Sequence, residues 1–147
     1  MIPFAEWMPD RPDYKSEGAT EALNVFPSTK SYKPLNDLTV YSAALTERPL
    51  GATAALQSNG TTYNFVGTAT YLHNLQAAGT WEDVSVAGNY STTAGEYWRF
   101  AQWGDQVLAV NYSDNPQEYT LGTSTDFAAL TTALKARYIA TTSDFVI

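Results

Sequence analysis

The feature that most constrains this chain is a strand-turn-strand pattern that recurs over residues 38–147. Short runs rich in Thr, Val and aromatic residues, which suit pleated strands, surround turn sequences at Asn59-Gly60, Gly104-Asp105 and Ser143-Asp144. These turns stand roughly 40–45 residues apart, the spacing of a repeat with about four strands. No window shows sustained 3.6-residue periodicity with caps, so we expect little helix. The pattern predicts an all-β, antiparallel fold.

The runs form two sets of four and the beginning of a third. Their expected bounds are 52–57, 61–67, 71–75 and 80–85, then 97–103, 106–111, 117–122 and 127–130, then 137–140 and 145–147. Repeated four-stranded units are typical of β-propeller blades, and about 4–8 blades close a ring. We therefore expect a partial, propeller-like arrangement, in a chain that is the N-terminal part of a longer protein or whose sheets partners complete. The alternative is a compact sandwich closed by the third hairpin.

Turn chemistry and alternation predict the hairpins and the core. Asn59-Gly60 is typical of a type I′ turn, because both residues tolerate a positive φ. Alternation places Trp98 and Phe100 on one face of their strand, with Tyr97 and Arg99 on the other. The side chains expected to be largely buried are Phe65, Leu72, Trp81, Trp98, Phe100, Leu108, Val110 and Tyr119. The alternative for the aromatic set Trp81, Tyr97, Trp98, Phe100 and Trp103 is a platform for stacking sugars.

Residues 1–37 are irregular and proline-rich, since six of the seven prolines precede residue 50. One helical turn is expected over residues 17–23, and extended pieces are expected at 24–27 and 31–34. Phe4, Trp7 and Tyr14 are large aromatic residues in a segment without periodicity. Such a segment gains order only by docking, on its own domain or on a neighbouring subunit. We predict an assembly arm in which these three residues are the interface anchors.

The net charge and the composition limit the kinds of partner that we expect for this chain. The net charge of −7 and the low isoelectric point argue against gripping nucleic acid through its phosphates. The acidity either keeps the protein soluble or provides a surface that DNA passes without sticking. No stretch is apolar enough to span a membrane. The first residues do not resemble a signal peptide, so we expect synthesis in the cytoplasm without export by that route.

The sequence contains few residues that could catalyse a reaction or bind a metal ion. Because Cys is absent and His73 is the single histidine, neither a Cys nucleophile, a Ser-His-Asp set nor a two-His metal site can be built. Most carboxylates occur at turns, where Asp is favoured for local reasons. No phosphate-binding glycine loop is present. We expect no enzymatic activity, no cofactor and no metal.

Several motifs resemble one protein family. They are Phe4-x-x-Trp7-x-Pro9-Asp10, Ala22-x-Asn24-Val25-x-Pro27, Tyr32-x-Pro34, the run from Tyr63 to Thr68 and the run from Trp98 to Asn111. Together they resemble the tail hub or nozzle proteins of short-tailed phages, also called packaged-DNA stabilisation proteins. Members of that family are considerably longer than this chain.

The resemblance implies a function and partners. It implies a structural virion protein of the tail, with a propeller-like body, that forms a hexameric ring under the portal and adaptor. Such a ring would extend the DNA conduit, help retain packaged DNA and pass it during ejection. The implied partners are copies of the chain, adaptor or portal proteins, and tailspikes or fibres. The alternatives are a capsid decoration or other tail protein, and a carbohydrate-binding receptor-recognition module.

Overall fold

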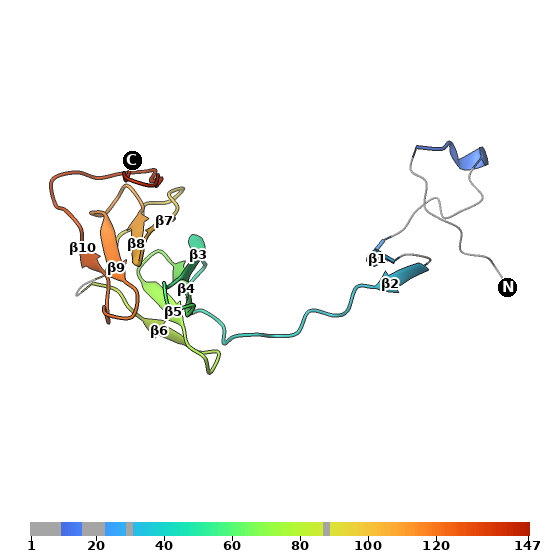
Figure 1. The fold of residues 1–147 in the computed structure, drawn as a ribbon, viewed down its shortest axis with the longest axis horizontal. Coiled ribbons are helices and arrows are strands. Elements are labelled where there is room, and N and C mark those ends of the chain that lie inside the picture. Colours follow the sequence, from blue (N-terminus) through green and yellow to red (C-terminus); the bar gives the residue numbers. More distant parts are fainter. Residues whose placement is uncertain (1–9, 16–22, 29–30, 87–88) are drawn as a thin grey trace. The chain divides into compact units, whose positions relative to one another are not determined.

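The computed structural model describes residues 10–15, 23–28, 31–86 and 89–147 (Figure 1). The chain divides into two compact units, Met1–Val40 and Tyr41–Ile147. Every regular element in the described residues is a β-strand except one 3-10 turn, η1, at Asp13–Lys15. The predicted all-β, antiparallel class is therefore confirmed for this part of the chain.

The first unit contains a two-stranded antiparallel sheet. Strand β1, Val25–Ser28, pairs with β2, Ser31–Pro34. The extended pieces predicted from residues 24 and 31 are thus strands. Asn24 precedes β1 with a φ of 56°, and its carbonyl oxygen accepts a 2.9 Å hydrogen bond from the Leu35 N–H. The helical turn predicted over residues 17–23 lies, apart from its last residue, outside the described residues.

The second unit begins with a four-stranded antiparallel sheet. Its strands occur in chain order, so each pairs with the next along the sequence. They are β3 at Gly51–Leu56, β4 at Thr62–Gly67, β5 at Leu72–Leu75 and β6 at Trp81–Asp83. The four runs predicted between residues 52 and 85 are confirmed. The last is shorter than expected, because the ladder with β5 ends at the pair of His73 and Asp83.

A second four-stranded sheet follows with the same connectivity. Its strands are β7 at Arg99–Trp103, β8 at Gln106–Val110, β9 at Gln117–Thr120 and β10 at Ala128–Ala129. The chain then forms one more short hairpin, in which Thr141 and Val146 form an isolated antiparallel bridge. Ala140 and Ile147 exchange two 2.8 Å backbone hydrogen bonds beside this bridge. The hairpin predicted at Ser143-Asp144 is therefore present.

The other two predicted hairpins also form, but one turn differs from its expected type. Gly60 has a φ of 90°, whereas Asn59 does not have a positive φ. The loop is longer than a two-residue turn, because Leu56 pairs with Thr62 and the Gly60 N–H donates to the Gln57 carbonyl oxygen. The type I′ prediction was therefore wrong. At Gly104-Asp105 the loop has two residues, with a positive φ at the glycine only, as a type II′ turn requires.

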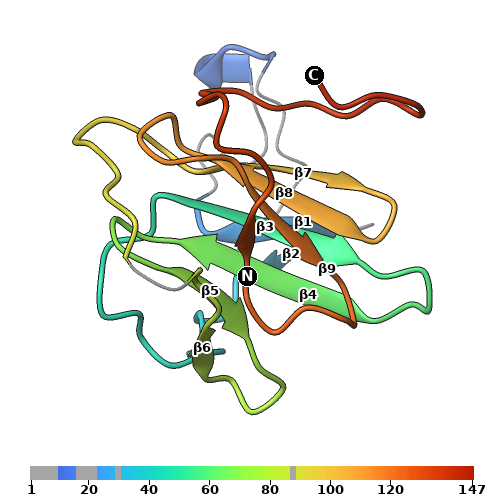
Figure 2. The same ribbon diagram turned by 90° about the vertical axis from the view of Figure 1, so that its left-hand side faces the viewer.

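The two sheets pack face to face, with β7 and β8 above β3 and β4 (Figure 2). The Trp98 N–H donates a 3.1 Å hydrogen bond to the Leu50 carbonyl oxygen where β3 and β7 begin. At the other end of these strands, the Gln102 amide bonds to both the N–H and the carbonyl oxygen of Leu56. Strands β3 and β7 therefore lie side by side and run parallel. Two sheets and a hairpin form no closed propeller within the described residues.

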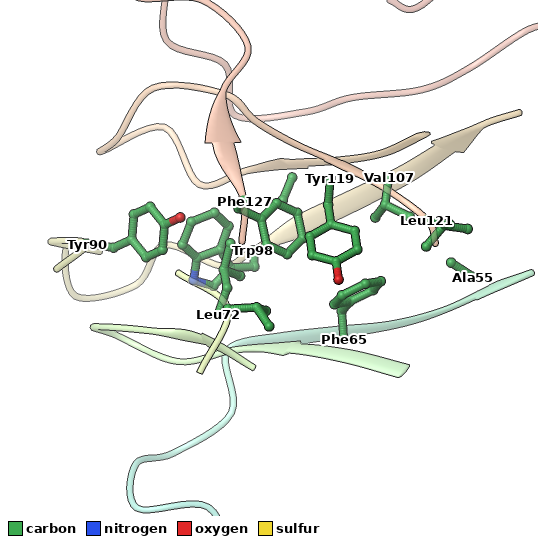
Figure 3. Packing of buried hydrophobic residues seen from close by; sticks show 11 residues of the cluster. Ala55, Phe65, Leu72, Tyr90, Trp98, Val107, Tyr119, Leu121 and Phe127 are labelled. Carbon is green, nitrogen blue, oxygen red and sulfur yellow. The ribbon is translucent and has the colours of Figure 1, made fainter. Parts of the chain in front are cut away.

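An aromatic core fills the space between the sheets (Figure 3). The Phe65 ring contacts the rings of Tyr119 and Phe127, with centroids 5.0 and 5.4 Å apart, and these two rings contact each other. Trp98 lies edge-to-face with Tyr90 at 5.0 Å. Edge-to-face pairs of this kind add stability beyond the area they bury. The core therefore unites the two sheets into one packed body.

Six of the eight predicted core residues are buried, namely Phe65, Leu72, Trp98, Leu108, Val110 and Tyr119. Phe100 is half-buried and packs against the core, on the same face as Trp98, as the alternation predicted. Trp81 is also only half-buried. Its indole Nε1 donates a 2.9 Å hydrogen bond to the Ala43 carbonyl oxygen. The register places it on the face of the first sheet opposite Phe65, so its predicted burial was wrong.

Candidate functional site

The predicted interface anchors are only partly described. Phe4 and Trp7 lie outside the described residues. Tyr14 belongs to η1 and is 82% exposed, with the Lys15 ammonium 5.6 Å from the centre of its ring. An exposed aromatic residue of this kind is available to a partner. The interface role of the three residues stays a prediction.

His73 lies on β5 and is buried with only 8% of its surface exposed. Neither ring nitrogen has a hydrogen-bond partner among the described residues. The Tyr71 ring lies 5.8 Å away, and Glu47 approaches the same region. Burial by itself would raise the pKa of the Glu47 carboxyl, but hydrogen bonds from Thr68 and Thr70 and the nearby His73 together hold that pKa below its usual value. His73 is thus a packing residue in the described structure.

Two carboxylates, Asp105 and Asp114, accept hydrogen bonds that join separate loops. Asp105 accepts two 2.7 Å hydrogen bonds from Ser58, one from its N–H and one from its hydroxyl. Asp114 accepts from the Asn111 side chain at 2.8 Å and from the Ser91 N–H at 3.1 Å. Within the ranges that the structure covers, no three His, Cys, Asp or Glu residues are grouped to bind a metal ion. No helix in those ranges is long and apolar enough for a membrane span.

The C-terminal segment lies against the second sheet, on the face away from the first (Figure 2). The Tyr112 N–H donates to the Ala136 carbonyl oxygen at 2.9 Å, and the Thr141 hydroxyl donates to the Gln102 carbonyl oxygen at 3.0 Å. The Trp103 indole bonds to the Ser143 carbonyl oxygen at 3.4 Å. The segment therefore runs parallel to β7, as β7 runs parallel to β3. Leu108 and Val110 are buried but lie outside the core cluster that includes Val107 and Ala109, so alternation places them on the side of the sheet where this segment lies.

This segment also presents apolar side chains to solvent. We call them the C-terminal strip, which consists of Leu134, Tyr138, Phe145, Val146 and Ile147, each between 41% and 75% exposed. Phe145, Val146 and Ile147 are consecutive residues of the last hairpin, and contiguous exposed apolar groups commonly mark interaction surfaces. The strip is therefore a candidate surface for contact with a partner.

The predicted sugar-stacking platform is not assembled as expected. Trp98 and Phe100 belong to the core, and Trp81 lies on the far face of the first sheet. Tyr97 is 47% exposed and shares a cavity with Arg99 and Tyr138 instead. The sequence pattern predicted only that Tyr138 belongs to the first strand of a third repeat. Its place beside Arg99 depends on how the C-terminal segment returns over β7.

Comparison with known proteins gives no assignment. No model of a protein family matches the chain, and no curated protein matches it significantly.

Proposed function

We propose that this chain is a structural virion protein of the tail hub or nozzle of a short-tailed phage. In this role it extends the DNA conduit and helps to retain and release packaged DNA. The observation that carries the proposal is the stacking of two four-stranded sheets with adjacent, parallel first strands. A hairpin at residues 140–147 continues the series.

A partial β-propeller accounts for this stacking. In a propeller the first strands of successive blades surround a central channel, and each blade packs its face on the next. Here the ends of β3 and β7 are joined through Leu50 with Trp98 and through Leu56 with Gln102. At the outer strands, the Phe127 N–H donates a 2.8 Å hydrogen bond to the Val84 carbonyl oxygen. The proposal treats the two sheets as neighbouring blades.

Assembly with other subunits follows from the uncovered surfaces. Each repeat needs a neighbour to cover its apolar face, and the C-terminal strip offers such a surface. The proposed partners are copies of the chain in a hexameric ring, adaptor or portal proteins, and tailspikes or fibres. The net charge of −7 suits a conduit wall that repels the DNA duplex rather than binding it.

Location in the particle tests the proposal. Antibody labelling of virions, imaged by negative-stain electron microscopy, should place the protein in the tail. Images of the purified protein should show rings, and the double substitution Phe145→Ser with Ile147→Ser should reduce ring formation. The matched control is Leu56→Ser, which removes an exposed apolar side chain outside the strip. Labelling of the capsid surface would replace the tail proposal with a capsid decoration protein.

A further inference from the structure

A cavity of about 810 Å³ opens where β3, β7 and residues 138–139 meet. This volume lies within the range of about 300–1,000 Å³ that is typical of small-molecule sites. Its lining includes Thr53 of β3, Arg99 and Phe100 of β7, and the flanking Tyr97 and Tyr138. Three separate segments therefore contribute to one concave surface.

Aromatic rings and one arginine dominate the accessible wall. Tyr97 is 47% exposed and Tyr138 is 71% exposed, so both rings are available for stacking. The Arg99 guanidinium lies 5.8 Å from the centre of the Tyr138 ring. An arginine held over an aromatic face keeps its planar hydrogen-bonding fork available at the edge.

Arg99 differs from its neighbour Arg137 in its partners. Arg137 forms a 2.6 Å ion pair with Glu96 and lies over the Tyr112 ring at 4.7 Å. Arg99 has neither an ion pair nor a hydrogen bond with any of the residues that the structure describes. Arg99 is the only charged side chain in the described lining of the cavity, which contains no carboxylate, and this points to an anionic ligand.

The cavity also offers backbone hydrogen-bonding groups. Strands β3 and β7 are edge strands, each paired on one side only. Between the contacts at Leu50 and Leu56, the groups of β3 that point away from β4 have no partner within the described residues. Such groups can bind hydroxyls of a ligand. A ligand that carries hydroxyls and one negative charge would match these walls.

We propose that this cavity binds a short segment of an acidic polysaccharide. A sugar ring stacks on Tyr138 or Tyr97, and a carboxylate on that sugar accepts two hydrogen bonds from the Arg99 fork. The edges of β3 and β7 bind the hydroxyls. The planar Arg99 fork matches a single carboxylate, which can accept two parallel hydrogen bonds from it. In the proposed propeller the first strands β3 and β7 face the channel, so this binding site would be a second role of the channel side of the fold.

Calorimetric titration of the purified full chain tests the site, with trigalacturonate as the probe and neutral trigalactose as its matched control. We expect saturable binding of trigalacturonate, and binding of trigalactose that is weaker by about tenfold or more, as loss of a charged hydrogen bond implies. Arg99→Gln and Tyr138→Ala should each weaken trigalacturonate binding by about tenfold or more. Tyr138→Phe, which keeps the ring, should bind as the unchanged chain does.

Arg48→Gln is the control for general charge, because Arg48 is exposed and does not line the cavity. It should leave the affinity unchanged, and thermal unfolding should show that all variants remain folded. Equal binding of the neutral trisaccharide, equal weakening by Arg48→Gln, or absence of saturable binding would each overturn the proposal. Tighter binding of a triglutamate peptide would replace the sugar with an acidic peptide. These results are independent of where the protein lies in a virion.

Discussion

The indole ring of Trp98 lies directly on Gly67, and its Nε1 donates a 2.8 Å hydrogen bond to the Thr68 carbonyl oxygen. A Cβ at residue 67 would collide with this ring. Glycine therefore allows the residue before the second sheet to contact the backbone of the first sheet. This contact joins the two sheets at the end where the cavity opens.

Truncation of Trp98 should destabilise the second unit more than any exposed aromatic substitution. Trp98→Ala removes a side chain that is only 2% exposed, which typically costs about 3–5 kcal/mol. Trp103→Ala is the matched control, since Trp103 is 42% exposed, and it should cost about 1 kcal/mol or less. Urea unfolding followed by circular dichroism measures both. Equal losses in the two variants would contradict the assigned core.

Two glycine positions should respond differently to substitution. Gly67→Ala should reduce the free energy of unfolding by about 1–3 kcal/mol, because the added methyl group overpacks the contact with Trp98. Gly60→Asn should cost only about 1 kcal/mol, because position 60 has open space around it and Asn tolerates its positive φ of 90° better than most side chains do. Urea unfolding midpoints compare the two. A neutral Gly67→Ala would show that the sheets can separate at this contact.

Stability should fall at alkaline pH through Tyr90. Burial of Tyr90 raises its pKa to about 12, above the usual value of about 10. The folded state therefore holds the Tyr90 proton more tightly than the unfolded state does. The contribution of protonated Tyr90 to the free energy of unfolding is fully present below about pH 10. It is lost as pH rises from about 10 through about 12, by an amount on the order of 2 kcal/mol. Burial of Tyr119, whose pKa is also raised, acts in the same direction.

Unfolding measured as a function of pH checks this prediction. The Tyr90→Phe variant cannot ionise at position 90, so its stability should fall less steeply between about pH 10 and 12. It should also lose the 3.1 Å hydrogen bond from the Tyr90 hydroxyl to the Gln117 side chain, which lowers stability at neutral pH. Identical alkaline slopes in the two proteins would exclude Tyr90 as the responsible group.

Replacing the acidic turn residues with alanine should lower stability by different amounts. Asp105→Ala and Asp114→Ala each remove hydrogen bonds between separate loops, and each should cost about 0.5–1.5 kcal/mol. Asp144→Ala should change stability by about 0.5 kcal/mol or less, because its only side-chain partner among the described residues is the adjacent Ser143 hydroxyl. Thermal melts of the three variants provide the comparison. A larger effect at Asp144 would contradict the assigned contacts.

The purified chain should have negligible affinity for double-stranded DNA, even at low salt. Phosphate binding depends on clustered Lys and Arg, and this chain has a net charge of −7. A gel-shift assay at low ionic strength is the measurement, with a basic DNA-binding protein as the positive control. Tight DNA binding that weakens steeply with salt would contradict the proposal that the conduit wall repels DNA.

The sequence by itself determined the strands and the hairpins. Turn residues such as Gly60 and Gly104 limit the backbone locally, and runs such as Gln106–Val110 favour strands through their own side chains. These signals depend on neighbours in sequence, so they were available without the fold. The same local patterning identified Phe65, Leu72 and Trp98 as core residues.

Only the tertiary structure decided which surfaces meet. Trp81 is a large apolar residue of the kind that is usually buried. It lies on the outer face of the first sheet, because the core forms on the side where the second sheet packs. Tyr90 lies in a connection with no strand pattern, yet it is buried against Trp98. The cavity needs Arg99 and Tyr138, 39 positions apart in the sequence, to lie side by side. Contacts of this kind depend on how whole sheets stack, which local propensity does not encode.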